Sequence, residues 1–226
     1  MGLKESGLRG SLRNVSVDIR AIPDAVVDNF EDAPDGPYGS EETIADYYSG
    51  DVAAYVRSTS DVVEGSRALA YDGGASANVI QSAPGDGLPQ YPDAGDSLRV
   101  FLRAPNFTSF AFGIEPDSGP AGYIALLADG DMRIRRFDDP DSPTDLTTSS
   151  PSITGTDWYW AEIGTPSSAD PSITFDLYEL NTTDLSRGSS VDSLSTSDSN
   201  YIGEAIGART GTGDLSHTAI DDIRVL

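Results

Sequence analysis

The sequence predicts an all-β protein: an antiparallel jelly-roll β-sandwich with a short extended N-terminal arm. Three observations lead to this prediction. Short segments alternate apolar and polar side chains, turn-forming residues separate them, and no long amphipathic helix pattern occurs. Alternation with a period of two is typical of a strand that buries one face. A chain of 226 residues is long enough for one such sandwich with its own hydrophobic core.

The clearest strand patterns lie in the second half of the chain. In residues 98–103, the side chains of Leu98, Val100 and Leu102 share one face, and residues 173–177 repeat this pattern. Such segments are typical of antiparallel strands with one buried face. We therefore expect Leu98, Val100 and Leu102 in the core.

Residues 123–127 and 132–137 flank the turn Ala128-Asp129-Gly130-Asp131. A short turn of Asp and Gly between two apolar alternating segments predicts a β-hairpin. By contrast, residues 138–152 and 186–200 are rich in Ser, Thr, Asp and Pro. We expect these two stretches to be long surface loops.

The charge of the chain is strongly negative. Its formal net charge is −23, from 37 acidic and 14 basic residues, and Lys4 is the only lysine. At multimolar salt the Debye length falls to about 3 Å or less, which removes most of the repulsion among such charges. We therefore expect a salt-adapted protein from a halophilic source. No basic stripe is present to replace phosphate counterions, so no nucleic-acid partner is expected.

Other composition features exclude several classes of site. Cysteine is absent, which excludes disulfides and thiolate metal sites. There is no run of about 18 apolar residues that could span a membrane, and the N-terminal residues lack the apolar segment of a secretory signal. Arg133, Arg135 and Arg136 form a basic cluster, but acidic residues surround it in the sequence.

The first residues of the chain differ from the rest. Residues 1–20 contain four basic and two acidic residues, a net charge of +2, although the whole chain carries −23. Within them, Val15, Val17 and Ile19 alternate with polar residues as in a strand. We expect residues 1–25 to form a docking arm and residues 26–226 to form the sandwich domain. An arm with unpaired strand edges is expected to pair with other copies or with a partner protein.

Six segments occur in an order that resembles laminin-G-like and concanavalin A-like jelly rolls. The resemblance covers about residues 26–226, and its segments are 27–32, 63–69, 122–127, 157–163, 173–178 and 219–225. The resemblance implies a jelly-roll fold, but this superfamily contains lectins, glycan hydrolases, adhesins and structural domains. The arm and the junction that follows it also resemble the start of structural proteins from tailed viruses of haloarchaea.

The resemblance further implies a structural calcium ion that ties the first strand to the last. Candidate ligands are the carboxylates of Asp28, Glu31, Asp32 and Asp221, since calcium takes six to eight oxygen ligands. Alternation places Asp221 on the face of its apolar neighbours, where a carboxylate requires a partner. The alternative is a carboxylate bound to backbone amides or to an arginine, with Asp222 simply solvated.

Two groups of aromatic residues are candidates for ligand binding. Trp158 and Trp160 lie on one face of a strand and could form a sugar-stacking platform, but we expect them to pack in the core. Tyrosines in loops are better candidates for an exposed rim, because loops on a rigid scaffold commonly carry recognition. These tyrosines are Tyr38, Tyr47, Tyr48 and Tyr91.

The sequence offers little support for catalysis. Its one histidine, His217, is expected in a loop, and no thiol is present. The paired-carboxylate strand Glu-x-Asp-x-x-Glu of related glycan hydrolases is also missing. We therefore expect a non-enzymatic virion surface protein of a haloarchaeal tailed virus, a capsid decoration or tail component that docks through residues 1–22. The alternatives are a carbohydrate-binding module or adhesin of a haloarchaeal cell surface, and a retaining glycosidase.

Overall fold

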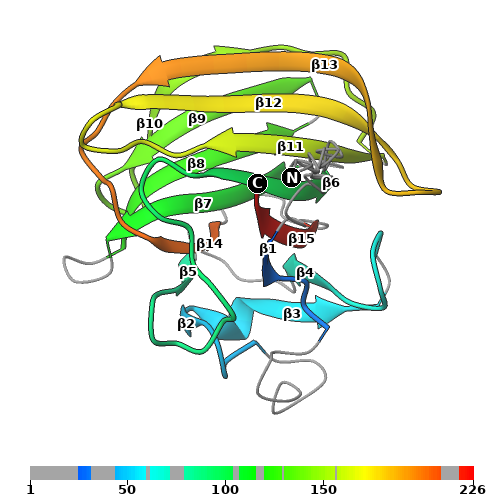
Figure 1. Ribbon diagram of the computed structural model, residues 1–226, viewed down its shortest axis with the longest axis horizontal. Coiled ribbons are helices and arrows are strands. Elements are labelled where there is room, and N and C mark those ends of the chain that lie inside the picture. Colours follow the sequence, from blue (N-terminus) through cyan, green and yellow to red (C-terminus); the bar gives the residue numbers. More distant parts are fainter. Residues whose placement is uncertain are drawn as a thin grey trace, which may run out of the picture.

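Two antiparallel sheets packed face to face form the protein, as the computed structural model in Figure 1 shows. The structure describes residues 25–31, 44–59, 62–71, 79–103, 107–115, 120–128, 130–155, 157–209 and 219–226. The only helical element of these residues is the short 3₁₀ turn η1 (Val52–Ala54). The predicted all-β antiparallel sandwich is confirmed.

The first sheet contains eight strands. They are β1 (Ala25–Asp28), β3 (Tyr55–Ser58), β4 (Ala68–Tyr71), β6 (Ser97–Arg103), β11 (Trp158–Gly164), β12 (Ser172–Asn181), β13 (Ser186–Ser197) and β15 (Ala219–Val225). Their order is β13-β12-β11-β6-β15-β4-β3, and β1 also pairs with β15. The pairing of β15 with β6 places the last strand of the chain in the middle of the sheet.

The second sheet contains seven strands. They are β2 (Ser49–Gly50), β5 (Val79–Ser82), β7 (Phe107–Glu115), β8 (Ala121–Ala128), β9 (Asp131–Phe137), β10 (Thr144–Ser149) and β14 (Ala205–Arg209). Their order is β10-β9-β8-β7-β14-β5-β2. β8 and β9 pair directly across the turn at Gly130, so the predicted hairpin is confirmed.

The core lies between the two sheets and follows the predicted alternation. Leu98, Val100 and Leu102 of β6 are fully buried, as are Phe110 and Phe112 of β7. These side chains belong to one continuous cluster that joins both sheets. Burial of large apolar side chains contributes roughly 1.5–3 kcal/mol each, so this layer dominates the stability of the fold.

The two predicted loops, residues 138–152 and 186–200, each contain an edge strand, so the prediction of loops along their whole length is wrong. Residues 144–149 form β10 and residues 186–197 form β13, each at the end of its sheet. Most side chains of β13 are exposed, and Leu194 is its one buried residue. An edge strand with few buried side chains needs no apolar alternation. A Ser-rich and Thr-rich segment can therefore form such a strand without showing a strand pattern in the sequence.

The last strand changes partners along its length. Ala219 and Ile220 of β15 pair with β4, whereas residues 223–225 pair with β1. Between these two halves, the register with β6 shifts after Asp221, and Asp222 has a positive φ of 45°. This irregularity lies at the residues for which the sequence predicted a metal site.

The N-terminal part of the chain is described only from Ala25, the first residue of β1. The expected strand at residues 15–20, the remainder of the docking arm and the loop position of His217 all lie outside the described residues. The boundary between an arm at 1–25 and a domain at 26–226 therefore stays a prediction. Within the described ranges, no helix has the length and apolar character needed to cross a membrane.

Candidate functional site

The structure places the predicted calcium ligands near the bulge of β15, but it gives their oxygens other partners. Asp28 lies at the end of β1. Its Oδ1 accepts a hydrogen bond from the amide of Phe30 at 2.7 Å, and its Oδ2 accepts one from the Tyr48 hydroxyl at 2.8 Å. Asp32 lies outside the described residues.

Glu31 binds the loop that precedes β4. Its Oε1 accepts hydrogen bonds from the amides of Ser66 at 2.5 Å and Arg67 at 2.6 Å, and its Oε2 accepts one from the Ser66 hydroxyl at 2.7 Å. Burial alone would raise the pKa of Glu31, but these hydrogen bonds lower it below its usual value. The hydrogen bonds therefore favour the ionised form of Glu31, in which both carboxylate oxygens bind the loop.

Asp221 binds the same loop from the other side. Its Oδ2 accepts hydrogen bonds from the amides of Val63 and Glu64, each at 3.0 Å. The side chain is fully buried, and Oδ1 has no partner among the described residues. Burial raises the pKa of Asp221 to about 7, against the effect of the two amide hydrogen bonds and with added repulsion from Glu64 and Glu31.

The contacts of these carboxylates favour binding to backbone amides and other protein donors over binding to calcium. Calcium takes six to eight oxygens, but both oxygens of Asp28 and of Glu31 are engaged by protein donors, and so is one oxygen of Asp221. Across the part of the chain that is described, no three acidic or histidine side chains are grouped so that they could hold a metal ion. The alternative interpretation of Asp221, a carboxylate bound to amides, is confirmed. Calcium at this corner stays a prediction that the contacts do not support.

Asp222 is buried and paired, so the expectation that it is simply solvated is wrong. Its Oδ1 accepts a hydrogen bond from Arg224 Nε at 2.7 Å, and its Oδ2 pairs with Arg99. Arg224 also reaches Glu64 Oε1 at 2.9 Å. The backbone irregularity turns this second carboxylate toward two guanidinium groups, which ties β15 to β6 and to the loop before β4.

The three arginines of the basic cluster, all in β9, also form ion pairs with acidic side chains. Arg133 pairs with Asp131 and with Asp145 of β10, and Arg135 also pairs with Asp145. Arg136 binds Asp198 at 2.9 Å. These ion pairs join β9 to the edge strand β10 and to the segment after β13, in agreement with a structural role for the cluster.

Both tryptophans of β11 face outward, and the core-packing prediction for them is wrong. Tyr159, Ala161 and Ile163 are buried in the core, whereas Trp158 and Trp160 on the opposite face are only half-buried. The predicted alternation along this strand is confirmed, but alternation does not indicate which face of a strand meets the other sheet.

The loop tyrosines that the structure describes are buried or only partly exposed. Tyr48 is buried and donates a hydrogen bond to Asp28, and Tyr47 packs against the core. Tyr91 is also partly buried, and its hydroxyl lies 2.9 Å from Ser82 Oγ. Tyr38 lies outside the described residues. Partly exposed aromatic side chains of the described residues therefore lie on β11, on β12 and in loops.

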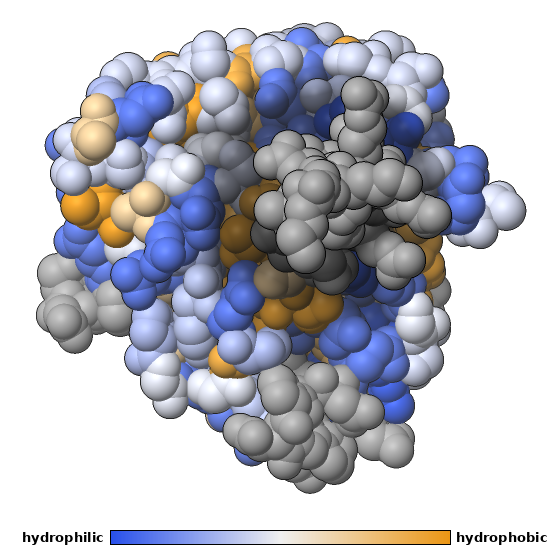
Figure 2. Space-filling view, viewed as in Figure 1, coloured by the Kyte–Doolittle hydropathy of each residue, from blue (hydrophilic) through white to orange (hydrophobic). Residues whose placement is uncertain are grey.

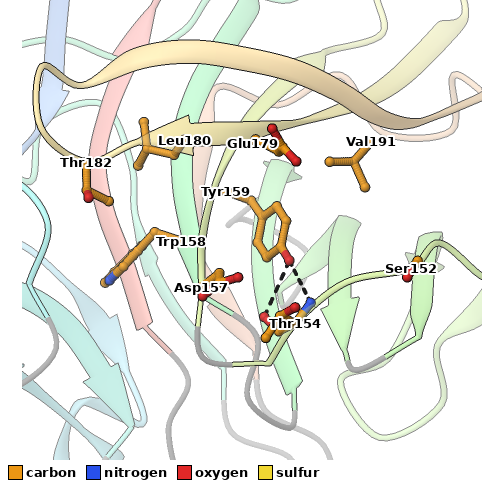
Figure 3. A pocket seen from close by; sticks show the side chains of 9 residues that line it. All are labelled: Ser152, Thr154, Asp157, Trp158, Tyr159, Glu179, Leu180, Thr182 and Val191. Atoms are coloured by element: carbon orange, nitrogen blue, oxygen red, sulfur yellow. Dashed lines mark hydrogen bonds between the residues drawn. The ribbon is translucent and has the colours of Figure 1, made fainter.

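A cavity of about 550 Å³ opens where β11 begins and β12 ends. Figure 3 shows the Tyr159 ring in the middle of the lining side chains, with Asp157 and Glu179 on opposite sides of it in this view. The lining residues are Ser152, Thr154, Asp157, Trp158, Tyr159, Glu179, Leu180, Thr182 and Val191. The cavity thus combines one indole, one phenol, three hydroxyl side chains and two carboxylates.

Strand register and one hydrogen-bonded loop shape this cavity. Tyr159 pairs with Glu179 across β11 and β12, which places both side chains at the same end of the sandwich. The Tyr159 hydroxyl accepts a hydrogen bond from the Thr154 amide at 2.7 Å and donates one to the Thr154 carbonyl at 3.4 Å (Figure 3). Burial raises the pKa of Tyr159, and the negative charges of Asp157 and Glu179 add to this effect. The phenol stays protonated and anchors the loop that forms one wall.

Most of these lining residues could not be found from the sequence. Ser152 and Thr154 lie in polar segments without a motif, and Glu179 is one of many acidic residues. Only Trp158 carried a signal, as part of the tryptophan pair. The cavity depends on the register between β11 and β12 and on the path of the loop before β11, neither of which leaves a local pattern.

Comparisons with known proteins concern the fold alone. No protein-family model matches the chain, and no curated protein matches it in sequence. Among solved structures, the chain is similar to a carbohydrate esterase from the Shiga toxin-encoding bacteriophage phi24B, with 14% identity, a TM-score of 0.44, and coverage of 79% of this chain and 89% of that one. It is also similar to the PL-14 alginate lyase from Aplysia kurodai (12% identity, TM-score 0.46, 79% and 88% covered). A third is the galectin LEC-6 from Caenorhabditis elegans (11% identity, TM-score 0.38, 61% and 86% covered).

Proposed function

We propose that this protein binds carbohydrate in the cavity beside Trp158 and that it does so without catalysing a reaction. The observation that carries the proposal is the composition of that cavity, in which an indole lies next to hydroxyl and carboxylate groups. Ligand sites are concave and combine apolar or aromatic walls with a few polar groups that fix orientation. A sugar ring presents an apolar face for the indole and hydroxyl groups for the polar wall.

The polar groups of the cavity match the hydrogen-bonding needs of a sugar. The carboxylates of Asp157 and Glu179 accept hydrogen bonds only, so each can receive sugar hydroxyl groups. The hydroxyl groups of Ser152, Thr154 and Thr182 can both donate and accept. Both tryptophans lie at the outward face of β11, but only Trp158 lines the cavity.

The biological setting that we propose is the surface of a virion of a haloarchaeal tailed virus. The acidic composition supports salt adaptation, and the positive charge of residues 1–20 supports docking of residues 1–22 onto neighbouring copies or onto capsid or tail proteins. Glycans of the host surface would be the ligand in this setting. The alternative setting is a carbohydrate-binding module or adhesin on a haloarchaeal cell.

A glycan array probed in high salt tests the binding proposal. Wild-type protein should bind a defined group of glycans, and Trp158→Ala should lower the affinity for them at least tenfold, about 1.4 kcal/mol. Trp160→Ala is the matched control, because it removes the neighbouring outward indole that does not line the cavity. Equal losses in the two variants, or no glycan bound by wild-type protein, would contradict the proposal. Conversion of a bound glycan into product would show an enzyme instead.

The docking proposal has its own test. Deletion of residues 1–22 should abolish incorporation into virus particles and reduce the oligomeric state measured by light scattering, while glycan binding persists. If the truncated protein is incorporated and assembles as the full chain does, the arm has no docking role. Attachment of the full protein to haloarchaeal envelopes without any viral partner would favour the adhesin.

A further inference from the structure

The two carboxylates of the cavity have no cationic partner. Asp157 and Glu179 line it together, and the side-chain carboxylate of neither forms an ion pair or a hydrogen bond with a described residue. No arginine, lysine or histidine is part of the lining. Elsewhere on the same sheet the pattern differs: Glu162, for example, binds Arg187 at 2.7 Å. The cavity therefore presents negative charge that the described protein does not neutralise.

Both charges act on the centre of the cavity. Tyr159 lies between the two carboxylates in the view of Figure 3, and the pKa of its hydroxyl is raised by burial and then by the charges of Asp157 and Glu179. A positively charged group next to Tyr159 would be attracted by the same two negative charges. An acidic group at that position would be repelled.

The aromatic wall favours the same kind of ligand. A cation near the face of an indole or phenol ring is attracted by the ring quadrupole, by roughly 0.5–1 kcal/mol at exposed sites. Trp158 and Tyr159 supply one indole and one phenol to the lining. An ammonium group also offers three hydrogen-bond donors, which matches acceptor-only carboxylates better than a hydroxyl group does.

We propose that the cavity recognises a glycan that carries a protonated amino sugar, with the ammonium group between Asp157 and Glu179 and the ring against Trp158. This inference rests on the proposed carbohydrate-binding function and names the ligand class of the same site. Neutral sugars bind more weakly than amino sugars, and uronic or sialic acids are excluded by the two carboxylates.

Calorimetric titration with two matched probes tests this proposal. The probes are a tetramer of β-1,4-linked glucosamine and the same tetramer fully N-acetylated, which has the same linkages and length but no ammonium groups. At a pH at which the amines are protonated, the glucosamine tetramer should bind at least tenfold more tightly. Its affinity should fall as salt is raised across a range in which the protein stays folded, because exposed charges are screened.

Charge-removing variants separate cavity recognition from general attraction to an acidic protein. Asp157→Asn and Glu179→Gln should each weaken the glucosamine tetramer at least fivefold and leave the N-acetylated tetramer within twofold. Asp93→Asn and Glu204→Gln remove exposed carboxylates that do not line the cavity, and they should change neither affinity.

Each result distinguishes this inference from the function on which it rests. Equal affinity for the two tetramers would overturn the amino-sugar inference and leave carbohydrate binding in place. A preference for the glucosamine tetramer that survives Asp157→Asn and Glu179→Gln would also overturn it, because the attraction would then come from the surface as a whole. Failure of both tetramers and of every glycan on the array would overturn the proposed function itself.

Discussion

The carboxyl group of Asp221 shows how one residue can hold a loop and make folding depend on pH. One of its oxygens binds two amides of the loop before β4, and the other has no described partner. Burial raises its pKa to about 7, with added repulsion from Glu64 and Glu31. The folded protein thus binds a proton at Asp221 at a pH at which the unfolded chain, with a pKa of about 3.9, has lost it.

The contribution of Asp221 to stability should therefore fall as pH rises. It is fully present below about pH 4 and is lost progressively up to about pH 7, because in this window the folded state binds more protons than the unfolded state. The difference between the folded pKa of about 7 and the unfolded pKa of about 3.9 corresponds to about 4 kcal/mol. Asp221→Asn, which stays neutral, should remove this dependence in denaturant melts between pH 4 and 8.

The comparison must use the difference between wild type and variant. Carboxylates that do not interact with Asp221, such as Asp198 with its lowered pKa, contribute stability that increases with pH in both proteins, and this contribution cancels in the difference. A difference curve that is flat with pH would contradict the account of Asp221. Calcium or a chelator should leave both melting temperatures unchanged, and a calcium-dependent rise in wild type alone would establish a metal site.

At the scale of strands, the sequence revealed those with one buried face and concealed those at the edges. β6 and β12 were predicted because their apolar side chains alternate, and the β8–β9 hairpin because of its turn. β10 and β13 were not predicted, because an edge strand is held mainly by backbone hydrogen bonds to a single neighbour. Such hydrogen bonds require no particular pattern of side chains in the sequence. The cavity was missed for a related reason, since it depends on the register that places Tyr159 opposite Glu179.

A central strand should tolerate change far less than an edge strand. Gly207 lies in β14 between β5 and β7, and a Cβ atom there would meet the backbone carbonyl oxygen of Ile80. Gly207→Ala should therefore destabilise the protein by about 2–3 kcal/mol, as overpacking typically does. Ser195→Ala on the exposed edge strand β13 should change stability by less than about 0.5 kcal/mol. Chemical denaturation measures both, and equal effects would contradict the strand order.

At the scale of the whole molecule, the net charge of −23 governs the conditions under which this fold is stable. Figure 2 shows a largely hydrophilic surface with a few hydrophobic patches on the visible face of the described part. Arginine partners neutralise some carboxylates, as at β9, but the chain has 37 acidic residues for 14 basic ones. The excess charge repels itself in dilute buffer and is screened in concentrated salt.

Stability should therefore increase with salt. Raising sodium chloride from about 0.1 M to 2 M shortens the Debye length from about 10 Å to less than 3 Å, and we expect a gain of about 3 kcal/mol, or about 6–12 °C in melting temperature. A variant with Asp51→Asn, Asp93→Asn and Glu204→Gln, which neutralises three exposed carboxylates, should have a smaller salt response. An equal response in both proteins would indicate that salt acts through apolar burial and not through charge.

Carbohydrate binding beside Trp158 is the central claim, and the chain contains only two tryptophans with which to test it. Each indole N–H gives one signal in a proton–nitrogen correlation spectrum, and Trp158→Phe and Trp160→Phe assign the two. The indole of Trp160 donates to Glu162 at 2.9 Å, and Trp160 does not line the cavity. Titration with the glycan that binds most tightly on the array should shift the Trp158 signal in a saturable way and leave the Trp160 signal in place. Saturable binding that leaves the Trp158 signal unmoved would contradict the assignment of this cavity as the binding site.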